Sequence, residues 1–222
     1  MTRDVGALVP AAGLGLRLGP GEPKALRLLA GEPLLVHAVR GLRACPDVGP
    51  VVVAAPPDGV AGVAALLAPY DVRVVPGGER RPDSVAVALA ALGRRTALVL
   101  VHDAARCLVP ADVVARVVAA LRDGAEAVVP VVPVADTVKR VRRDRVLETL
   151  QREDLRAVQT PQGFARGVLE RAHAAGPDDH TDDAGMVEAL GIEVRTVPGS
   201  EEAFKVTRPL DLLLAEAVLR GR

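Results

Sequence analysis

Arg17 and Lys24 lie within a glycine-opened segment near the start of the chain, VPAAGLGLRLGPGEPKAL over residues 9–26. Gly13 and Gly15 allow a ligand to approach the backbone at points that any side chain would block. Successive backbone N–H groups in such a turn can surround phosphate oxygens, and the two basic side chains add positive charge. The segment therefore predicts a site for a polyphosphate.

The two common phosphate-binding motifs do not fit this segment. A dinucleotide fingerprint requires a third glycine where Leu18 stands, with a helix directly after it, and the prolines at 20 and 23 exclude that helix. An ATP-type loop requires Ser or Thr after its lysine, whereas Ala25 follows Lys24. We therefore expect a long loop that stays a loop.

Lysine is rare in this chain. The 28 basic residues include only Lys24, Lys139 and Lys205 as lysines. Because arginine serves almost everywhere else, each lysine indicates a position that needs a compact, rotatable ammonium group. Chance retention is the alternative. Lys139 lies in a segment of alternating charge and is interpreted as a surface residue.

Several acidic and histidine residues are candidates for chemistry. Asp103 follows an apolar run, where a carboxylate could bind Mg²⁺ or sugar hydroxyls; a helix cap or local turn is the alternative. Asp83 is interpreted as a partner of a helix terminus. The segment 181–183, TDD, opens a helix, so capping is as plausible as substrate contact. His37 is predicted to be a core residue, and His102 is assigned no proton transfer.

The elements that must position these residues follow an alternating pattern. Short, β-branched apolar runs predict buried strands, and the stretches between them have helical spacing. The strands are expected at 5–11, 51–55, 72–78, 97–103 and 125–132, and the helices at 33–44, 58–68, 82–93 and 110–124. This alternation predicts an α/β fold, a three-layer sandwich with a mostly parallel sheet. Ligands then belong at the carboxyl ends of the strands.

One segment departs from this pattern. Residues 133–154 alternate around a charged tip at 142–145, which predicts a projecting β-hairpin arm. A lone two-stranded hairpin is marginal in water, so we expect the arm to pack against a second copy of the chain. A hairpin folded back over its own domain is the alternative. After it we expect two helical stretches, a strand at 192–199 and a helix from Pro209, all within a single domain of residues 1–222.

The composition limits the classes of binding partner that we expect for this chain. The formal net charge of the 222 residues is zero, which gives no reason to expect nucleic acid or an anionic membrane. No apolar run approaches the roughly 20 residues needed to span a bilayer. Two cysteines without metal-like spacing, and an N-terminal stretch unlike a signal peptide, predict a cytoplasmic location. The lack of asparagine fits a hot-living source or a coding bias.

The chain resembles a known family in seven segments, in order and across nearly its whole length. They are AAGLGLR with the later PK, GGERRPDSV at 77–85, VHDAAR at 101–106, PVADTVKR at 133–140, QTPQGF at 159–164, TDD at 181–183 and KVTRP at 205–209. The first is similar to the signature of sugar and polyol phosphate nucleotidyltransferases. Together they resemble the 2-C-methyl-D-erythritol 4-phosphate cytidylyltransferase family of the non-mevalonate isoprenoid pathway, which implies a Rossmann-like nucleotidyltransferase fold.

The resemblance implies an activity: CMP transfer from CTP to 2-C-methyl-D-erythritol 4-phosphate, with release of pyrophosphate and with Mg²⁺ or another divalent cation. It implies that Arg17 and Lys24 stabilise the transition state at the α-phosphate and that Arg152 and Lys205 position the acceptor. It implies further substrate contacts at Ala11, Ala12, Gly13, Gly15, Gly78, Glu79, Ser84, Asp103, Ala104, Arg106 and Thr137. Asp103 is also the candidate metal ligand. Thr137 and Arg152 would reach the neighbouring site of a homodimer from the arm.

Two departures and two alternatives stay open. Cys107 stands where the family commonly has Pro, and we expect a slightly looser turn. Ala203 stands where the family often has Asn, so packing is expected to hold the Lys205 loop instead. A related enzyme could use another polyol phosphate, such as ribitol 5-phosphate. A nucleotide-binding module without turnover is the second alternative, although it would tolerate fewer converging cations than this chain has.

Overall fold

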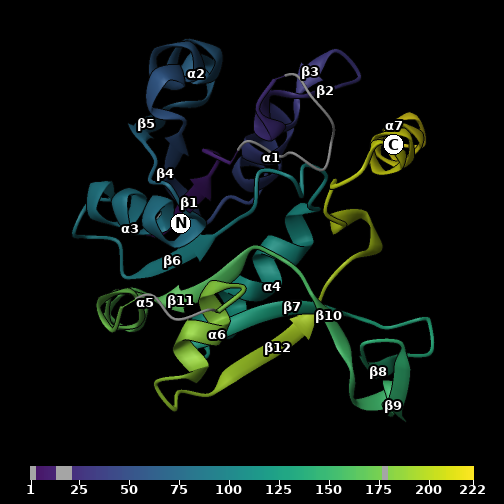
Figure 1. Cartoon of the computed structure of the whole chain (residues 1–222). Coiled ribbons are helices and arrows are strands. Elements are labelled where there is room, and N and C mark those ends of the chain that lie inside the picture. Colours follow the sequence, from purple (N-terminus) through teal and green to yellow (C-terminus); the bar gives the residue numbers. More distant parts are fainter. Residues whose placement is uncertain (1–3, 14–21, 177–179) are drawn as a thin grey trace.

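The computed structural model describes residues 4–13, 22–176 and 180–222, so the predicted roles of Gly15 and Arg17 lie outside the described residues. The described residues form an eight-stranded sheet with helices on both faces (Figure 1). This is the predicted three-layer α/β sandwich. No helix in the described part of the chain has the length and apolar character to cross a membrane.

The sheet is mostly parallel. Its strands are β1 (Val5–Pro10), β4 (Val48–Ala55), β5 (Val72–Pro76), β6 (Leu98–Val101), β7 (Ala127–Pro133), β10 (Arg156–Val158), β11 (Gln162–Ala165) and β12 (Val194–Pro198). β1 pairs in parallel with β4 and β6, β4 with β5, and β12 with β7. β11 lies antiparallel between β6 and β7, and β10 is antiparallel to β7. The pattern predicted the other six strands and missed β10 and β11.

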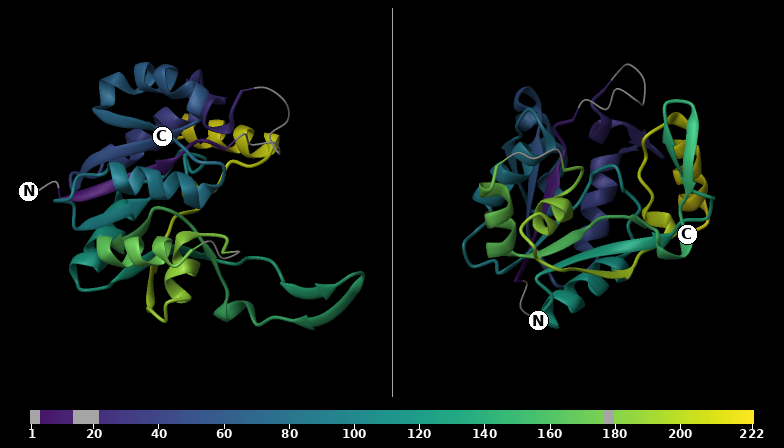
Figure 2. Two further views of the ribbon diagram at one scale, coloured as in Figure 1. Left: turned by 60° about the vertical axis from the view of Figure 1, so that its left-hand side comes forward. Right: turned by 60° about the horizontal axis from the view of Figure 1, so that its bottom comes forward.

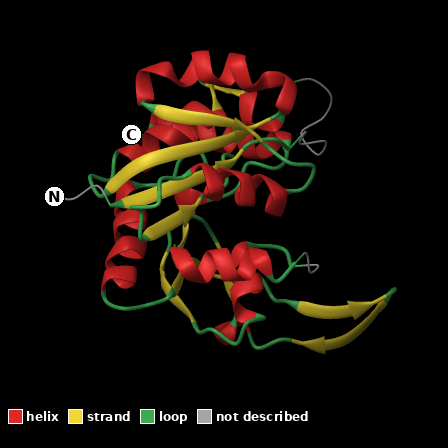
Figure 3. Cartoon of the chain, turned by 90° about the vertical axis from the view of Figure 1, so that its left-hand side faces the viewer, coloured by secondary structure: helices red, strands yellow, loops and turns green. Residues whose placement is uncertain are grey.

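Helices cover both faces of the sheet (Figure 3). The helices are α1 (Leu34–Arg43), α2 (Val60–Leu67), α3 (Arg81–Ala91), α4 (Ala111–Arg122), α5 (Arg166–Ala174), α6 (Asp183–Glu188) and α7 (Pro209–Arg220). α1, α2 and α4 share one buried apolar cluster with the sheet, and α3, α5 and α6 share the other. α7 packs on a smaller third cluster.

The connections contain shorter elements. The 3₁₀ turns are η2 (Lys24–Leu26), η3 (Pro57–Gly59), η4 (Ala68–Tyr70), η5 (Arg152–Asp154) and η6 (Glu201–Ala203). β2 (Leu28–Leu29) and β3 (Glu32–Pro33) form a small separate antiparallel pair. The expected loop therefore gives way to a 3₁₀ turn at Lys24, directly after Pro23.

The central strands explain why their sequences are continuously apolar. In β4, Val51 and Val53 face the cluster of α1, α2 and α4, whereas Val52 and Ala54 face the cluster on the opposite side. Successive side chains of a strand point to opposite faces, and here both faces are covered. A strand buried on both sides leaves no position for a polar residue, so the alternation typical of half-exposed strands is absent from β4.

The segment 133–154 forms a β-hairpin that projects from the rest of the chain (Figure 2). β8 (Lys139–Arg142) and β9 (Arg145–Thr149) pair only with each other among the described residues. Val141, Val146 and Leu147 on this arm are 53%, 60% and 52% exposed. The hairpin prediction is confirmed, and the alternative of a hairpin folded back over its own domain is wrong. Contact with a second copy stays a prediction.

Candidate active site

A cavity of about 200 Å³ opens at the carboxyl ends of β1 and β6. Its walls come from segments that are far apart in the sequence. The lining residues are Pro10, Ala11, Ala12, Gly13, Lys24, Ala25, Gly78, Glu79, Arg80, Arg81, Ser84, Asp103, Ala104, Ala105 and Lys205. Lys24 and Lys205 therefore share one cavity, as the predicted roles of both in one active site require. We call it the first cavity.

The first cavity gathers most of the predicted site residues. They are Ala11, Ala12, Gly13, Lys24, Gly78, Glu79, Ser84, Asp103, Ala104 and Lys205. Arg106 lies in an adjoining cavity, and Thr137 and Arg152 line a separate hollow on the arm. The backbone position of Lys24 is fixed by its neighbours in the chain: Pro23 precedes it, and the next residue, Ala25, is buried in the core.

One wall of the first cavity depends on two glycines, Gly77 and Gly78. The N–H of Gly77 donates to the carbonyl of Ala55 at 2.7 Å, which extends the pairing of β4. A Cβ atom on Gly77 would lie 2.6 Å from the Cβ of Ala12, and one on Gly78 would lie 2.4 Å from the Cβ of Asp83. Both distances are shorter than real contacts allow, so this turn requires glycine at both positions.

The turn leads directly into α3. The N–H of Gly78 donates to Oγ of Ser84 at 3.1 Å, which fixes the hydroxyl at the edge of the cavity. The Asp83 carboxylate accepts from the N–H of Arg80 at 3.1 Å and so caps the helix. Asp83 is therefore a structural residue of the helix start, as predicted, and Ser84 is the one that faces the cavity.

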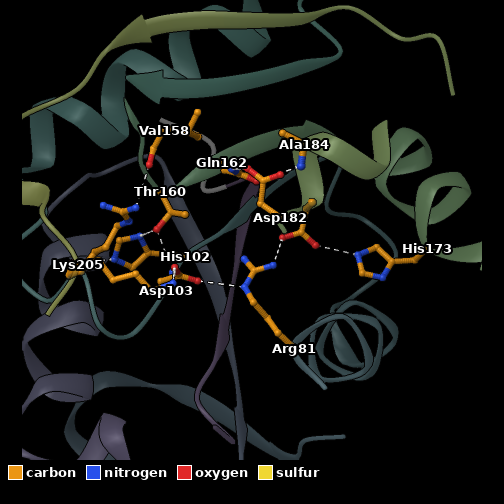
Figure 4. A network of polar contacts seen from close by, with 12 residues as sticks. Arg81, His102, Asp103, Val158, Thr160, Gln162, His173, Asp182, Ala184 and Lys205 are labelled. Carbon is orange, nitrogen blue, oxygen red and sulfur yellow. Dashed lines mark hydrogen bonds and ion pairs between the residues drawn. The ribbon is translucent and has the colours of Figure 1, made fainter. Parts of the chain in front are cut away.

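Asp103 lines the first cavity and lies between two cations (Figure 4). Its Oδ1 accepts from Nε of Arg81 at 3.1 Å, and its Oδ2 is 2.6 Å from Nζ of Lys205. Burial raises the pKa of Asp103, but the charges of Arg81 and Lys205 outweigh this effect and hold the pKa well below its usual range. The carboxylate is therefore ionised, and its two oxygens are divided between the two cations.

Arg81 continues this network into the core, and the sequence analysis missed it. Its Nη1 lies 2.7 Å from Oδ2 of Asp183, and Oδ1 of Asp183 lies 3.0 Å from Nε2 of His173. Asp183 is fully buried. Burial lowers the pKa of Arg81, but the charges of Asp183 and Asp103 outweigh this and raise the pKa above its ordinary value. One arginine in an arginine-rich chain carries no signal by its type; its place in the first turn of α3, directly before Pro82, was the available clue.

The two aspartates of the TDD segment have different structural roles. Asp182 caps α6, because its Oδ1 accepts from the N–H of Gly185 at 3.0 Å. Its Oδ2 accepts from Nε2 of Gln162 at 2.6 Å, which ties α6 to β11. Asp183 faces inward to Arg81 and His173. Capping therefore accounts for Asp182, and an internal ion pair accounts for Asp183.

A second cavity of about 220 Å³ adjoins the first. The two cavities share Arg81, Asp103 and Lys205. The remaining lining residues are Arg106, Val158, Gln159, Thr160, Gln162, Thr181 and Asp182. An ionised carboxylate with two bound cations thus separates two spaces that could each hold an anionic ligand.

Arg106 holds two chain segments at the second cavity. Its Nη1 donates to the carbonyl of Ala203 and its Nη2 to that of Val158, both at 2.9 Å. The Ala203 side chain is fully buried, and the N–H of Val206 donates to the carbonyl of Ala105 at 2.8 Å. The Lys205 segment is therefore held by packing, as expected, and also by these hydrogen bonds. Arg106 as a substrate contact stays a prediction.

The histidines behave as structural residues. His37 is buried in α1, with Nε2 3.0 Å from the carbonyl of Leu29, which confirms it as a core residue. His102 is fully buried beside Asp103, and burial lowers its pKa to about 4. A neutral imidazole that is closed to solvent agrees with the absence of an assigned proton-transfer role for His102.

The arm residues lie apart from both cavities. Thr137 and Arg152 line a hollow at the base of the arm, and Nη1 of Arg152 donates to the carbonyl of Ala135 at 3.0 Å. A single chain therefore does not bring these two residues to Lys24 or Lys205. Lys139 is exposed and donates to Oγ1 of Thr149 at 2.6 Å, which confirms it as a surface residue.

Asp103 was also the candidate metal ligand. Both of its oxygens are engaged by cations here, and the described residues contain no group of three or more His, Cys, Asp or Glu side chains placed to hold a metal ion. Mg²⁺ commonly binds through one or two carboxylates together with substrate phosphates and water. The donor set fits a metal that a nucleotide brings with it, with Asp103 as the protein ligand, and this assignment stays a prediction.

A mostly parallel sheet with a glycine turn and two lysines in a cavity at its carboxyl edge defines an α/β protein with a site for a phosphorylated ligand. Comparison with known proteins identifies the family. The model of the family "2-C-methyl-D-erythritol 4-phosphate cytidylyltransferase" matches residues 5–221. The chain belongs to this family.

Individual relatives agree with the family match. A protein of that name from Streptomyces coelicolor is 58% identical, over 97% of this chain and 85% of the relative. Another from Saccharopolyspora erythraea is 56% identical, over 97% and 99% of the two chains. Among solved structures, the cytidylyltransferase of that name from Thermus thermophilus is similar with a TM-score of 0.80 at 38% identity, covering 98% of this chain and 99% of the other. The 4-diphosphocytidyl-2C-methyl-D-erythritol synthase from Anaerococcus prevotii gives a TM-score of 0.85 at 26% identity, covering 97% and 98%.

Proposed function

We propose that this chain transfers CMP from CTP to 2-C-methyl-D-erythritol 4-phosphate, forming the CDP-linked alcohol and pyrophosphate for isoprenoid precursor synthesis. One observation carries the proposal beyond family membership. Two adjoining cavities share Arg81, Asp103 and Lys205, and Lys24 lies in the first of them. A reaction that joins two anionic substrates requires two neighbouring spaces with cations at their border.

The first cavity suits CTP. Gly78 and Ser84 form a polar edge beside a backbone that only glycine can follow, and Ala11 and Ala12 line the same cavity. These groups can recognise a base through N–H and C=O contacts. The Lys24 side of the cavity then receives the triphosphate, and Arg17 is proposed to join it from the glycine-rich segment.

The second cavity suits the polyol phosphate. Lys205 and Arg106 supply positive charge for the phosphate, and Asp103 supplies an ionised carboxylate that can accept hydrogen bonds from hydroxyl groups. Thr181 and Gln162 add polar side chains to the same wall. A ligand with one anionic end and several hydroxyl groups matches this mixture of charge and polarity better than an apolar ligand does.

The residues act mainly by positioning and charge. The attacking phosphate is already ionised, so the reaction requires no general base. Two like unit charges at 4 Å repel by about 4 kcal/mol at an effective dielectric near 20, and transfer at phosphorus depends chiefly on alignment and cations. Lys24 and Arg17 would neutralise charge that develops at the α-phosphate, and Lys205 would hold the nucleophile against it. Mg²⁺, held by the triphosphate and Asp103, would supply further charge neutralisation when bound.

The same proposal includes a homodimer and a cytoplasmic location. Thr137 and Arg152 do not reach either cavity of their own chain, and the arm exposes Val141, Val146 and Leu147. Docking of the arm on a second copy would bury these side chains and deliver Arg152 to the acceptor. Cys45 and Cys107 are both buried and free, which supports a reducing compartment.

The test is a pyrophosphate release assay with CTP and Mg²⁺. Parallel reactions contain 2-C-methyl-D-erythritol 4-phosphate, ribitol 5-phosphate or no acceptor. Release with the first acceptor alone supports the proposal. Release only with ribitol 5-phosphate would move the chain to the related activity, and release with neither would leave a nucleotide-binding protein without turnover.

A further inference from the structure

His102 is a buried polar residue that the proposed mechanism does not use. It follows β6 and precedes Asp103 directly, and its side chain is 0% exposed. A fully buried imidazole offers no surface to a substrate, so any functional effect must act through its neighbours. Figure 4 shows those neighbours: the ring lies between Thr160 and the segment that begins at Asp103.

Three polar contacts join these residues. Nδ1 of His102 lies 3.0 Å from Oγ1 of Thr160, and the same Oγ1 lies 3.0 Å from the backbone nitrogen of Asp103. Nε2 of His102 lies 3.2 Å from the carbonyl oxygen of Arg106. Each end of the ring therefore meets a segment that lines the second cavity.

The direction of every hydrogen bond follows from the chemistry of the partners. The carbonyl of Arg106 can only accept, so Nε2 must carry the proton. A neutral ring then has a lone pair at Nδ1, which the Thr160 hydroxyl fills by donating its proton. The hydroxyl oxygen keeps its lone pairs and accepts from the N–H of Asp103. Each of these buried donors then has an acceptor, which buried polar groups require.

We propose that His102 is a positioning residue for the transfer reaction. Through the Thr160 hydroxyl it fixes the backbone at Asp103, and through the carbonyl of Arg106 it fixes the other end of the same turn. This turn carries the carboxylate that borders both cavities, and Thr160 belongs to the chain that returns from the arm by way of β10.

The arrangement also sets the polarity of the second cavity. Because its only proton is donated to His102, the Thr160 hydroxyl can accept a hydrogen bond from a ligand and cannot donate one. It therefore favours a hydroxyl group of a polyol over a phosphate oxygen at that position. This inference rests on the proposed function, because it assigns the second cavity to the polyol phosphate.

The first test compares variants of both partners. His102→Leu removes both hydrogen bonds, and Thr160→Val removes the hydroxyl at nearly constant shape. Each leaves buried polar groups unpaired, so we expect kcat/KM for the acceptor to fall about tenfold or more, with a smaller change in the KM for CTP. Thr160→Ser keeps the hydroxyl and should recover most of the kcat/KM for the acceptor that Thr160→Val loses. The double variant should be little worse than either single one, since both disrupt the same network.

A matched control is available within the chain. His37 is also buried and bonds a carbonyl from its Nε2, but it lies in α1 with Leu29 as its partner. His37→Leu should lower stability without changing the KM for the acceptor. His102→Gln serves as a milder second variant, because its amide can still donate to the carbonyl of Arg106. Urea unfolding of each variant confirms that the compared proteins are folded.

The second test needs no turnover and so remains decisive even if the proposed reaction is wrong. Nitrogen NMR of histidine-labelled protein, with only four histidines in the chain, should show the proton of His102 on Nε2 and a lone pair on Nδ1 at neutral pH. A proton on Nδ1 would overturn the proposed hydrogen-bond arrangement. Unchanged kcat and acceptor KM in folded His102→Leu would overturn the positioning role.

Discussion

Arg81→Met tests whether the buried ion-pair network stabilises the fold. Arg81 contacts Asp183 at 2.7 Å and Asp103 at 3.1 Å, and Asp183 is fully buried. Removal of one partner from a buried ion pair typically costs about 3–5 kcal/mol, because the remaining charge stays buried. The Arg81 side chain is 26% exposed, and Asp183 keeps its contact with His173. We therefore expect the lower end, a loss of about 3 kcal/mol in the free energy of unfolding.

The neighbouring arginine supplies the control. Arg80 pairs with Asp83 at 3.1 Å, but these side chains are 56% and 39% exposed. Exposed pairs contribute little to stability, so Arg80→Met should cost much less than Arg81→Met. In a domain of this size, 1 kcal/mol corresponds to roughly 2–4 °C in melting temperature. The two variants should thus differ clearly in thermal melts and in urea titrations at pH 7.

The loss of stability in Arg81→Met should also depend on pH, and the pKa of Asp183 gives the direction of that dependence. Burial raises the pKa of Asp183, but the hydrogen bond from His173 and the charge of Arg81 outweigh it and leave the pKa below the ordinary value. A depressed pKa contributes stability above the unfolded value, near 3.9, and this stability is lost as pH falls through the folded value. In Arg81→Met the folded pKa rises, so the stability gap to wild type should shrink between pH 7 and pH 4. Equal costs for Arg81→Met and Arg80→Met at pH 7 would refute the reasoning.

Three further predictions concern the proposed reaction. Gly78→Ala forces a Cβ to 2.4 Å from Asp83, so steady-state kinetics should show about a tenfold or larger rise in the KM for CTP, whereas Gly93→Ala, which meets open space, should not. Lys24→Met should fold normally and lose about a thousandfold in kcat, with Lys139→Met as the surface control; wild-type turnover in Lys24→Met would contradict the assignment. Mixing Lys24→Met subunits with Arg152→Ala subunits should restore part of the activity in mixed dimers, and no recovery in well-mixed dimers would place Arg152 at its own chain's site.

The sequence predicted the parallel core because its strands are buried on both faces. Runs such as residues 51–55 have no polar position, and the helices between them have apolar residues at helical spacing. β11 was missed for a physical reason. It reads QGFA, with Gln162 and Gly163 in half of its length. Gly163 is needed because a Cβ there would lie 2.5 Å from Cγ1 of Val117, which only the packed fold reveals.

The site was partly predictable. The residues that stand out by type or motif, such as Lys24, Lys205, Ser84 and Asp103, do line one cavity. Arg81 could not be found in this way, since its partners Asp103 and Asp183 lie far from it in the sequence and its own type is common. Composition can single out a residue of a rare type. A residue whose role depends on contacts with distant parts of the chain can be identified only from the folded structure.

The charges around the first cavity indicate how much positive charge the described residues of one chain supply. Among the described residues, four basic and two acidic side chains line it: Lys24, Arg80, Arg81, Lys205, Glu79 and Asp103. Asp103 neutralises much of the positive charge of Arg81 and Lys205, because it pairs with both side chains. Asp183 also pairs with Arg81 and neutralises its charge further. The remaining excess is small for a triphosphate and a second phosphate, whose mutual repulsion grows as they approach. Under the proposed function, additional positive charge would therefore arrive with the substrates or from other residues, and the proposed sources are Mg²⁺ carried by CTP, Arg17, and Arg152 of a second copy.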